Sequence, residues 1–183
     1  AGATGYRQGS LIPYKGRMIF DSADLAMMEE RGILLDVILH EMGHVLGFSK
    51  YFFERLGLTS GFDYTGSNAV LAYQNLTGDS SLDSVPLDNT GGEGRAGSHW
   101  REGVFDRELM TGLSESSPPM PLSIVTVGAF KDLGYVVDYS KADDFTLLSS
   151  SLSSSSLLLA SSNTDSLVST SKLSDGAFDG SVY

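Results

Sequence analysis

The chain has 183 residues, of which 41% are hydrophobic, and this is enough for one folded domain with a core. Acidic residues outnumber basic ones 23 to 12, and the net charge of −11 argues against nucleic acid as a partner. The chain has no cysteine, which excludes disulfides and thiolate metal sites, and no apolar run approaches the ~18 residues of a membrane span.

The N-terminal part is predicted to contain one strand and one short helix. Residues 16–20 are one possible strand. A helix over 23–31 can be capped by Asp21 or Ser22 and ended by Gly32. The chain starts at Ala1 with no signal-peptide pattern, so we expect it to be a piece of a longer protein.

A second helix is predicted over 33–46, ended by a tight turn at Gly47. Apolar residues recur there at spacings of three and four, which predicts a stripe that faces the core. The stripe consists of Leu34, Val37, Ile38, Met42, Val45 and Leu46.

Later segments alternate between helices and polar loops. Residues 48–58 fit a helix or irregular structure, 65–76 a short helix and 77–98 a loop. A further helix is predicted from Ser123, ended at Gly134. Residues 146–174 are rich in Ser and Leu without a period, so we predict a domain over 1–140 and a linker or poorly ordered tail over 141–183, with a short exposed strand as the alternative.

The three histidines of the chain carry the main functional signal. His40 and His44 fall in the run HEMGHVLG, which matches the pattern H-E-x-x-H-x-x-G. On a helix they stand one turn apart on one face, so both imidazoles can bind one metal ion, while Glu41 stands beside it. His99, 55 residues after His44, is the one histidine left to act as third ligand.

This donor set predicts catalytic zinc, which takes three protein ligands and keeps a fourth position open. Zinc can lower the pKa of a water from ~15.7 toward ~7, and Glu41 can take its proton and pass it to a leaving amine. The predicted reaction is hydrolysis of a peptide bond. A structural zinc site is the alternative, but such sites usually have four protein ligands, often Cys.

Several other residues have open interpretations. Glu54 could replace His99 as third ligand, as in gluzincin peptidases, and Asp36 could orient a ligand or face solvent. Tyr64 and Tyr73 are candidates for an oxyanion stabiliser, without a spacing argument. Two acidic pairs could suggest calcium, although capping and solvation also explain them: Asp21 with Asp24, and Asp143 with Asp144.

Beyond the zinc motif, two segments resemble the leishmanolysin family of metzincin peptidases. The first is SHWREGVFDRELMTG at 98–112, and the second is LSIVTVGAFKDLGY at 122–135. The general metzincin pattern places the third histidine a few residues after the glycine, whereas this family inserts several tens of residues, as between Gly47 and His99. The resemblance covers roughly residues 10–140.

The resemblance implies an α+β metzincin-like zinc endopeptidase acting on polypeptides. It implies zinc ligands His40, His44 and His99, a catalytic Glu41, and Met110 as the Met-turn residue under the metal. It also implies a secreted or cell-surface location and an association with cell adhesion. A non-catalytic zinc-binding or adhesion module is the rival interpretation, although the presence of Glu41 disfavours it.

Two departures from the family pattern affect these expectations. The chain lacks the disulfides of eukaryotic members, so it looks like a bacterial relative. Only 39 residues precede His40, too few for most of the sheet that metzincins place before the active-site helix. We therefore expect the C-terminal part of a catalytic domain.

Overall fold

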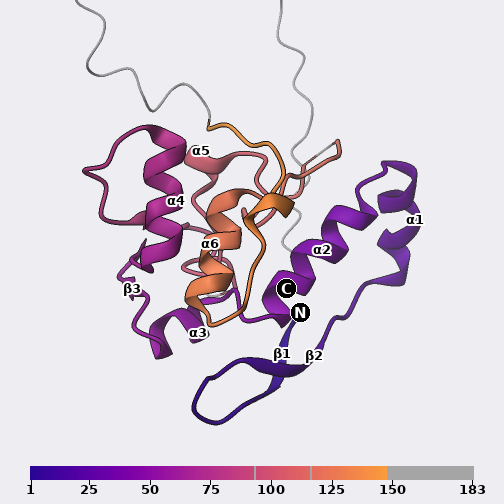
Figure 1. Ribbon diagram of the computed structural model, residues 1–183. Helices are drawn as coiled ribbons and strands as arrows, with labels where there is room; N and C mark the ends of the chain where they lie inside the picture. The colour runs from indigo at the N-terminus through magenta and orange to yellow at the C-terminus, as the bar shows by residue number, and fades with distance from the viewer. Residues whose placement is uncertain (93, 116, 148–183) are drawn as a thin grey trace, which may run out of the picture.

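The computed structural model describes residues 1–92, 94–115 and 117–147 (Figure 1). It is an α+β structure with helices dominant and two small antiparallel sheets. The strands are β1 (Gly2–Tyr6), β2 (Pro13–Arg17), β3 (Thr59–Ser60), β4 (Asp63–Tyr64) and β5 (Val85–Pro86). The helices are α1 (Ser22–Glu30), α2 (Leu34–Val45), α3 (Lys50–Arg55), α4 (Ser67–Thr77), α5 (Glu102–Phe105), α6 (Ile124–Asp132) and the 3-10 turn η1 (Tyr139–Lys141).

The N-terminal region is a hairpin of β1 and β2 followed by α1 and α2, which lie together on one side of the molecule (Figure 1). The predicted cap of α1 is confirmed, because the Asp21 carboxylate accepts a hydrogen bond from Ala23 N at 2.9 Å. Gly32 ends this helix with a φ of 73°. The strand that we predicted over 16–20 begins earlier, at Pro13.

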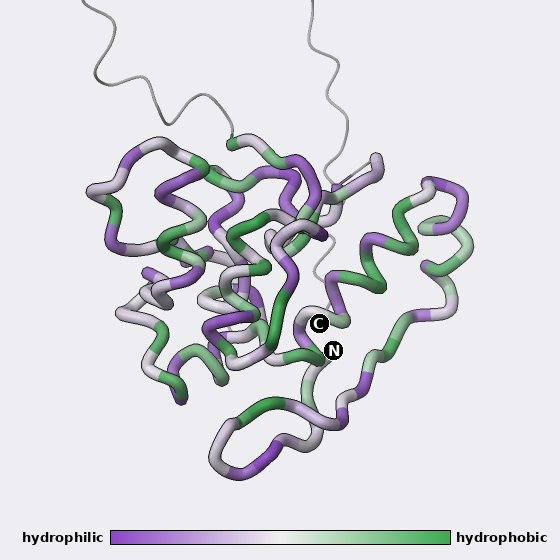
Figure 2. Tube along the Cα trace, in the orientation of Figure 1, coloured by the Kyte–Doolittle hydropathy of each residue, from purple (hydrophilic) through white to green (hydrophobic). Residues whose placement is uncertain are grey.

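The predicted core stripe on α2 is confirmed only in part, because Leu34, Ile38 and Val45 are half-buried. Of its members only Val37 is buried, at 4% exposure, whereas Met42 and Leu46 are 42% and 38% exposed. Leu35 and Leu39, which lie outside the predicted stripe, are also exposed. In Figure 2 hydrophobic and hydrophilic positions follow one another along this helix. The three- and four-residue spacing correctly predicted a helix, but the described residues cover only part of the apolar surface of α2.

The region after Gly47 is built on α4 and α6, which pack side by side (Figure 1). Gly128 permits the close approach, because a Cβ there would come within 2.8 Å of the Asn68 carbonyl oxygen. The Asp132 carboxylate at the end of α6 accepts hydrogen bonds from the first backbone amides of α4, those of Asn68 and Ala69, at 3.0 Å each. Helix α6 begins next to its predicted start, and the Ser123 hydroxyl caps it by accepting from Thr126 N at 3.3 Å.

Aromatic rings form the centre of this second region. Phe48 lies edge-on to Phe53 and to Trp100 with centroids 5.0 Å apart in each case, and Trp100 stacks on Phe105 at 5.4 Å. All four side chains have an exposure of 0%. Edge and offset contacts of this kind add to the stability that burial of the rings provides.

The segment with His99 is held in this core by short bridges that have little signal in the sequence. Trp100 pairs with Leu87 on one side and with Thr111 on the other. The predicted loop over 77–98 therefore contains β5 and ends in a fixed backbone path. Sequence periodicity also missed β1 and α5, because strands of two to five residues and a four-residue helix are too short to show one.

The start of the predicted tail contacts the domain. Asp143 N donates to Leu122 O and the Asp143 carboxylate accepts from Leu122 N, each at 2.9 Å. Phe145 stacks on Phe105. The rest of the tail, from residue 148, lies outside the described residues. Within the described ranges, no helix has the length and apolarity needed to cross a bilayer.

Candidate metal centre

Two of the three histidines project from the last turns of α2, as the spacing predicted. The helix ends at Val45, and Gly47 reverses the chain with a φ of 101°, a conformation that favours glycine. This turn places the Phe48 carbonyl oxygen 2.7 Å from His44 Nδ1. The turn therefore ends the helix and orients one imidazole.

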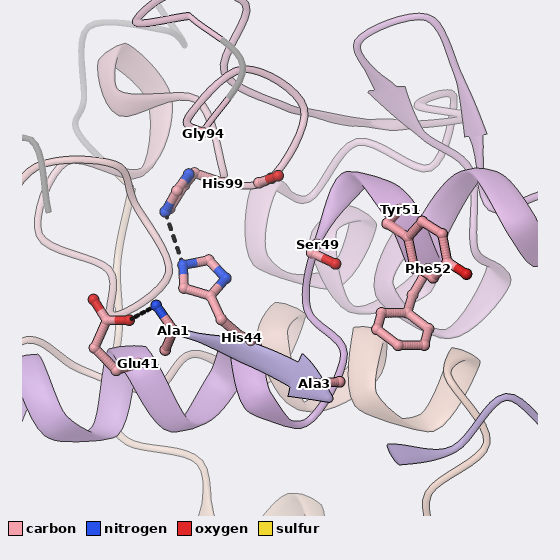
Figure 3. A pocket seen from close by; sticks show the side chains of 11 residues that line it. Ala1, Ala3, Glu41, His44, Ser49, Tyr51, Phe52, Gly94 and His99 are labelled. Carbon is pink, nitrogen blue, oxygen red and sulfur yellow. Dashed lines mark hydrogen bonds and ion pairs between the residues drawn. The ribbon is translucent and has the colours of Figure 1, made fainter. Parts of the chain in front are cut away.

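The structure brings His99 to His40 and His44, across 55 or more residues of sequence. The Nε2 atom of His44 lies 3.0 Å from that of His40 and 3.0 Å from that of His99, and the third side of the triangle is 3.2 Å. Figure 3 shows His44 and His99 facing each other above α2, with a dashed line joining the two Nε2 atoms.

The opposite ring nitrogens fix the tautomer of each imidazole. Each Nδ1 lies against a backbone carbonyl: His40 at 2.7 Å from Leu109 O, His44 at 2.7 Å from Phe48 O, and His99 at 3.0 Å from Arg95 O. A carbonyl oxygen only accepts, so each Nδ1 carries the proton and each Nε2 presents a lone pair. Three lone pairs at 3.0–3.2 Å repel one another unless a cation lies between them.

Burial keeps these imidazoles uncharged. It is the largest cause that lowers the pKa of all three, well below the usual value for His44 and to about 4 for His99. Mutual repulsion of their charged forms lowers the pKa of His44 and His99 further. Near neutral pH the ligand atoms are therefore deprotonated, as a metal requires.

The triangle also has the size that zinc prefers. A tetrahedral zinc ion with bonds of about 2.0–2.1 Å to nitrogen separates its ligand atoms by roughly 3.3–3.4 Å. The observed separations of 3.0–3.2 Å are slightly shorter. Small outward shifts of the rings would suit the ion, so the donor set and its geometry both fit zinc.

Glu41 lies on the same helix, next to His40 and 4% exposed. Its carboxylate Oε2 is 3.0 Å from the amino group of Ala1, an ion pair within the site (Figure 3). It is separate from the histidine triangle, as the 100° rotation per residue predicted. The carboxylate is thus not part of the histidine cluster.

A pocket of about 380 Å³ opens beside the histidines. Its walls include Glu41, His44 and His99, and residues 1–3, where β1 begins, run along it (Figure 3). Tyr51 and Phe52 form the far end, where the Tyr51 hydroxyl lies 2.9 Å from that of Tyr6. The pocket therefore gives access to His44, His99 and Glu41.

Met110 is 0% exposed. A Cβ on Gly43 would come within 2.6 Å of its sulfur, so α2 packs directly on this residue. The Met110 carbonyl oxygen accepts from Trp100 N at 3.0 Å, which connects the turn to the residue after His99. The carboxylate of Glu108 accepts from Met110 N at 2.6 Å and from the Ser123 hydroxyl at 2.7 Å, and it also bonds Thr126.

The structure decides several alternatives from the sequence. Glu54 is 58% exposed and pairs with Lys50 at 3.8 Å, away from the histidine cluster, which disfavours the gluzincin interpretation. Asp36 is buried and accepts from Met120 N at 3.0 Å, so it neither contacts a histidine nor faces solvent. The Tyr64 hydroxyl points to Asp132, and Tyr73 stacks on Phe105, so neither tyrosine lines the pocket.

Sequence reasoning missed the groups that orient the imidazoles. These are the backbone carbonyls of Phe48, Arg95 and Leu109, which carry no side-chain signal. It also missed the pocket residues Ser49, Tyr51 and Ser98. These three residues lie close in sequence to Gly47 or to His99, and this closeness is the only signal in the sequence that could have found them.

Comparison with known proteins supports the resemblance. The family model for leishmanolysin matches residues 8–160. The chain is similar to leishmanolysin from Leishmania donovani, with 31% identity over 144 residues, which is 72% of this chain and 24% of that protein. It is 30% identical to leishmanolysin from Leishmania major over 143 residues, 72% of this chain and 23% of that protein.

A leishmanolysin homolog from Crithidia fasciculata is 31% identical over 123 residues, which is 61% of this chain and 18% of that protein. The chain thus spans about a quarter or less of the length of these curated relatives.

Proposed function

The chain belongs to the leishmanolysin family, and on this premise we propose that it forms the zinc-binding part of a zinc-dependent endopeptidase. Leishmanolysins are zinc metalloendopeptidases, and the proposal extends that activity to this chain. The observation that supports it best is the triangle of three histidine Nε2 atoms. In each ring, Nδ1 donates its proton to a backbone carbonyl oxygen.

In this proposal His40, His44 and His99 hold one zinc ion. When bound, zinc would supply a Lewis acid that polarises the scissile carbonyl and makes a water molecule more acidic. The chain supplies the orientation of the ligands, through the three carbonyl acceptors. Met110 is proposed to act as a packing residue beneath them and not as a ligand.

Glu41 is proposed as the general base and then general acid. It is buried on the pocket wall, where it can accept a proton from water and return it to the leaving nitrogen.

The substrate class follows from the open pocket and from the family. A polypeptide in extended form could enter beside β1 and reach the histidines (Figure 3). We also propose a secreted or cell-surface location, which rests on the family alone. Cell adhesion is carried as a further proposal on the same basis.

The test is hydrolysis of a quenched, unstructured peptide by the zinc-loaded chain. Glu41→Ala should lower the rate by at least 10²-fold and leave zinc binding intact, because the carboxylate is not a ligand. Glu54→Ala is the matched control, since Glu54 is exposed and remote, and it should keep full activity. If the parent chain binds zinc but cleaves nothing, the rival non-catalytic zinc-binding module becomes the better description.

A further inference from the structure

We propose that the ion pair between Asp88 and Arg95 positions His99, so that it tunes the affinity of the site for zinc. The inference rests on the proposed function, because it concerns the same site. It assigns a role to two residues that lie outside the zinc-binding motif, in the loop that precedes the third histidine.

The first link is the backbone of Arg95. Its carbonyl oxygen accepts from His99 Nδ1 at 3.0 Å and also from Ser98 N at 3.1 Å. It is therefore the group that fixes the tautomer and the ring orientation of His99. Whatever fixes the Arg95 backbone also fixes the direction of the Nε2 lone pair.

The second link is the side chain of Arg95, whose Nε donates to Asp88 Oδ2 at 2.6 Å. The other carboxylate oxygen accepts from the amide and the hydroxyl of Thr90, at 2.9 and 2.7 Å. The side chains are 4% exposed for Asp88 and 23% for Arg95, so water screens this pair less than it would a surface pair. The carboxylate has a donor on each oxygen, and loss of Arg95 would leave one oxygen buried without its ion-pair partner.

The third link is the backbone of Asp88, which holds His99 from the other side. Asp88 N donates to the His99 carbonyl oxygen at 2.9 Å, and Gly97 N donates to the Asp88 carbonyl oxygen at 2.8 Å. Asp88 thus contacts His99 directly through the backbone and indirectly through Arg95. Asp88, Arg95 and His99 are therefore joined to one another by hydrogen bonds.

Packing confines the Arg95 side chain to this position. Gly91 and Gly112 both lie so close to it that neither has room for a Cβ. Gly112 follows the Met110 turn, so Arg95 also joins the loop to the turn beneath the site. A solvated surface ion pair would lack these contacts.

Removal of the pair should therefore let the Arg95 carbonyl move and let the His99 ring rotate. Groups that orient a metal ligand in this way typically change metal affinity by about 10–100-fold when they are replaced. We expect this range for Asp88→Asn and for Arg95→Gln. The variant with both substitutions should bind zinc about as tightly as the single variant with the lower zinc affinity, because both substitutions break the same ion pair.

The experiment measures zinc affinity of the full chain by competition with a chelator, and the His99 tautomer of the zinc-free chain by ¹⁵N NMR of the ring. Asp132→Asn is the matched control, because that carboxylate also accepts several hydrogen bonds but contacts no histidine. It should destabilise the fold without change in zinc affinity or tautomer. Arg95→Lys keeps the charge and should retain more affinity than Arg95→Gln.

The inference is supported if Asp88→Asn weakens zinc binding by 10-fold or more and the His99 imidazole becomes a mixture of its two tautomers. It is overturned if affinity and tautomer stay unchanged, or if Asp132→Asn weakens binding equally. If the parent chain itself binds no zinc, the proposed function fails. The tautomer in the zinc-free chain then still decides whether the pair orients His99.

Discussion

The two regions of the molecule differ in how much of their apolar surface is buried, although both contribute to one site. The first region is residues 1–47, and the second is the described residues from 48 onward. The first region supplies His40, His44 and Glu41 on a helix that leaves Leu35 and Leu39 exposed. None of its residues is among the buried members of the main core cluster. The second region supplies His99 from a segment bridged on both sides within an aromatic core.

The comparison indicates that His40 and His44 are held in place by different interactions from those that hold His99. In α2, helix geometry alone places two imidazoles together, so little packing is needed. His99 has no helix, and its position depends on bridges and buried polar groups such as Glu108. Substitutions in the second region should therefore cost more stability than comparable ones in the first.

The largest expected effect is at Glu108, which is 0% exposed and accepts hydrogen bonds from Met110, Ser123 and Thr126. Burial raises the pKa of this carboxyl and the hydrogen bonds oppose that rise. Glu108→Ala would leave several buried donors unpaired at about 1–3 kcal/mol each, so we expect a loss on the order of 4 kcal/mol. Urea unfolding of the zinc-free chain measures it.

Glu54→Ala is the control for this prediction, because its side chain is 58% exposed and its pair with Lys50 is a surface contact. It should change the free energy of unfolding by less than about 0.5 kcal/mol. Equal losses for the two variants would contradict the view that buried polar groups anchor the second region.

An intermediate effect is expected within α2, where the two faces differ. Val37→Ala removes a side chain that is 4% exposed and should cost about 1–3 kcal/mol. Leu35→Gln alters a side chain that is 63% exposed and should cost less than about 0.5 kcal/mol. Chemical denaturation of both variants checks this, and a large loss for Leu35→Gln would show that its face is covered.

The smallest effect is a pH dependence from Glu102 in the second region. Burial, aided by the charges of Glu115 and Asp106 and opposed by Arg95, raises the pKa of this carboxyl to about 7. The folded chain thus holds the proton more tightly than the unfolded one, so this group lowers stability as pH rises from about 4.5 to 7. The full shift would be about 3 kcal/mol, which solvent screening at this partly exposed site reduces to about 1 kcal/mol.

Glu102→Gln should remove this loss. The variant should match the parent chain near pH 4.5 and exceed it by about 1 kcal/mol at pH 8, as measured by urea unfolding at the two values. A parent chain whose stability relative to the variant does not vary with pH would show that Glu102 is fully solvated.

Sequence reasoning identified the helices with clear caps or long periods, such as α2 and α6, and brought His40, His44 and His99 together. These features are local or depend on rare residue types. It was wrong for Met42 and Leu46, because a period shows which residues share a face but not what covers that face. It also missed Asp88, Glu108 and the carbonyl acceptors, since their partners lie elsewhere in the chain and follow only from the fold.

The central claim is that one metal ion is held by imidazoles from both regions, and zinc affinity tests it most directly. Chelator competition on the parent chain should give one zinc ion per chain. His99→Ala should lower the affinity as strongly as His40→Ala does, while Glu54→Ala leaves it unchanged. An affinity that survives His99→Ala, or that is lost in Glu54→Ala, would contradict the claim and place the third ligand elsewhere.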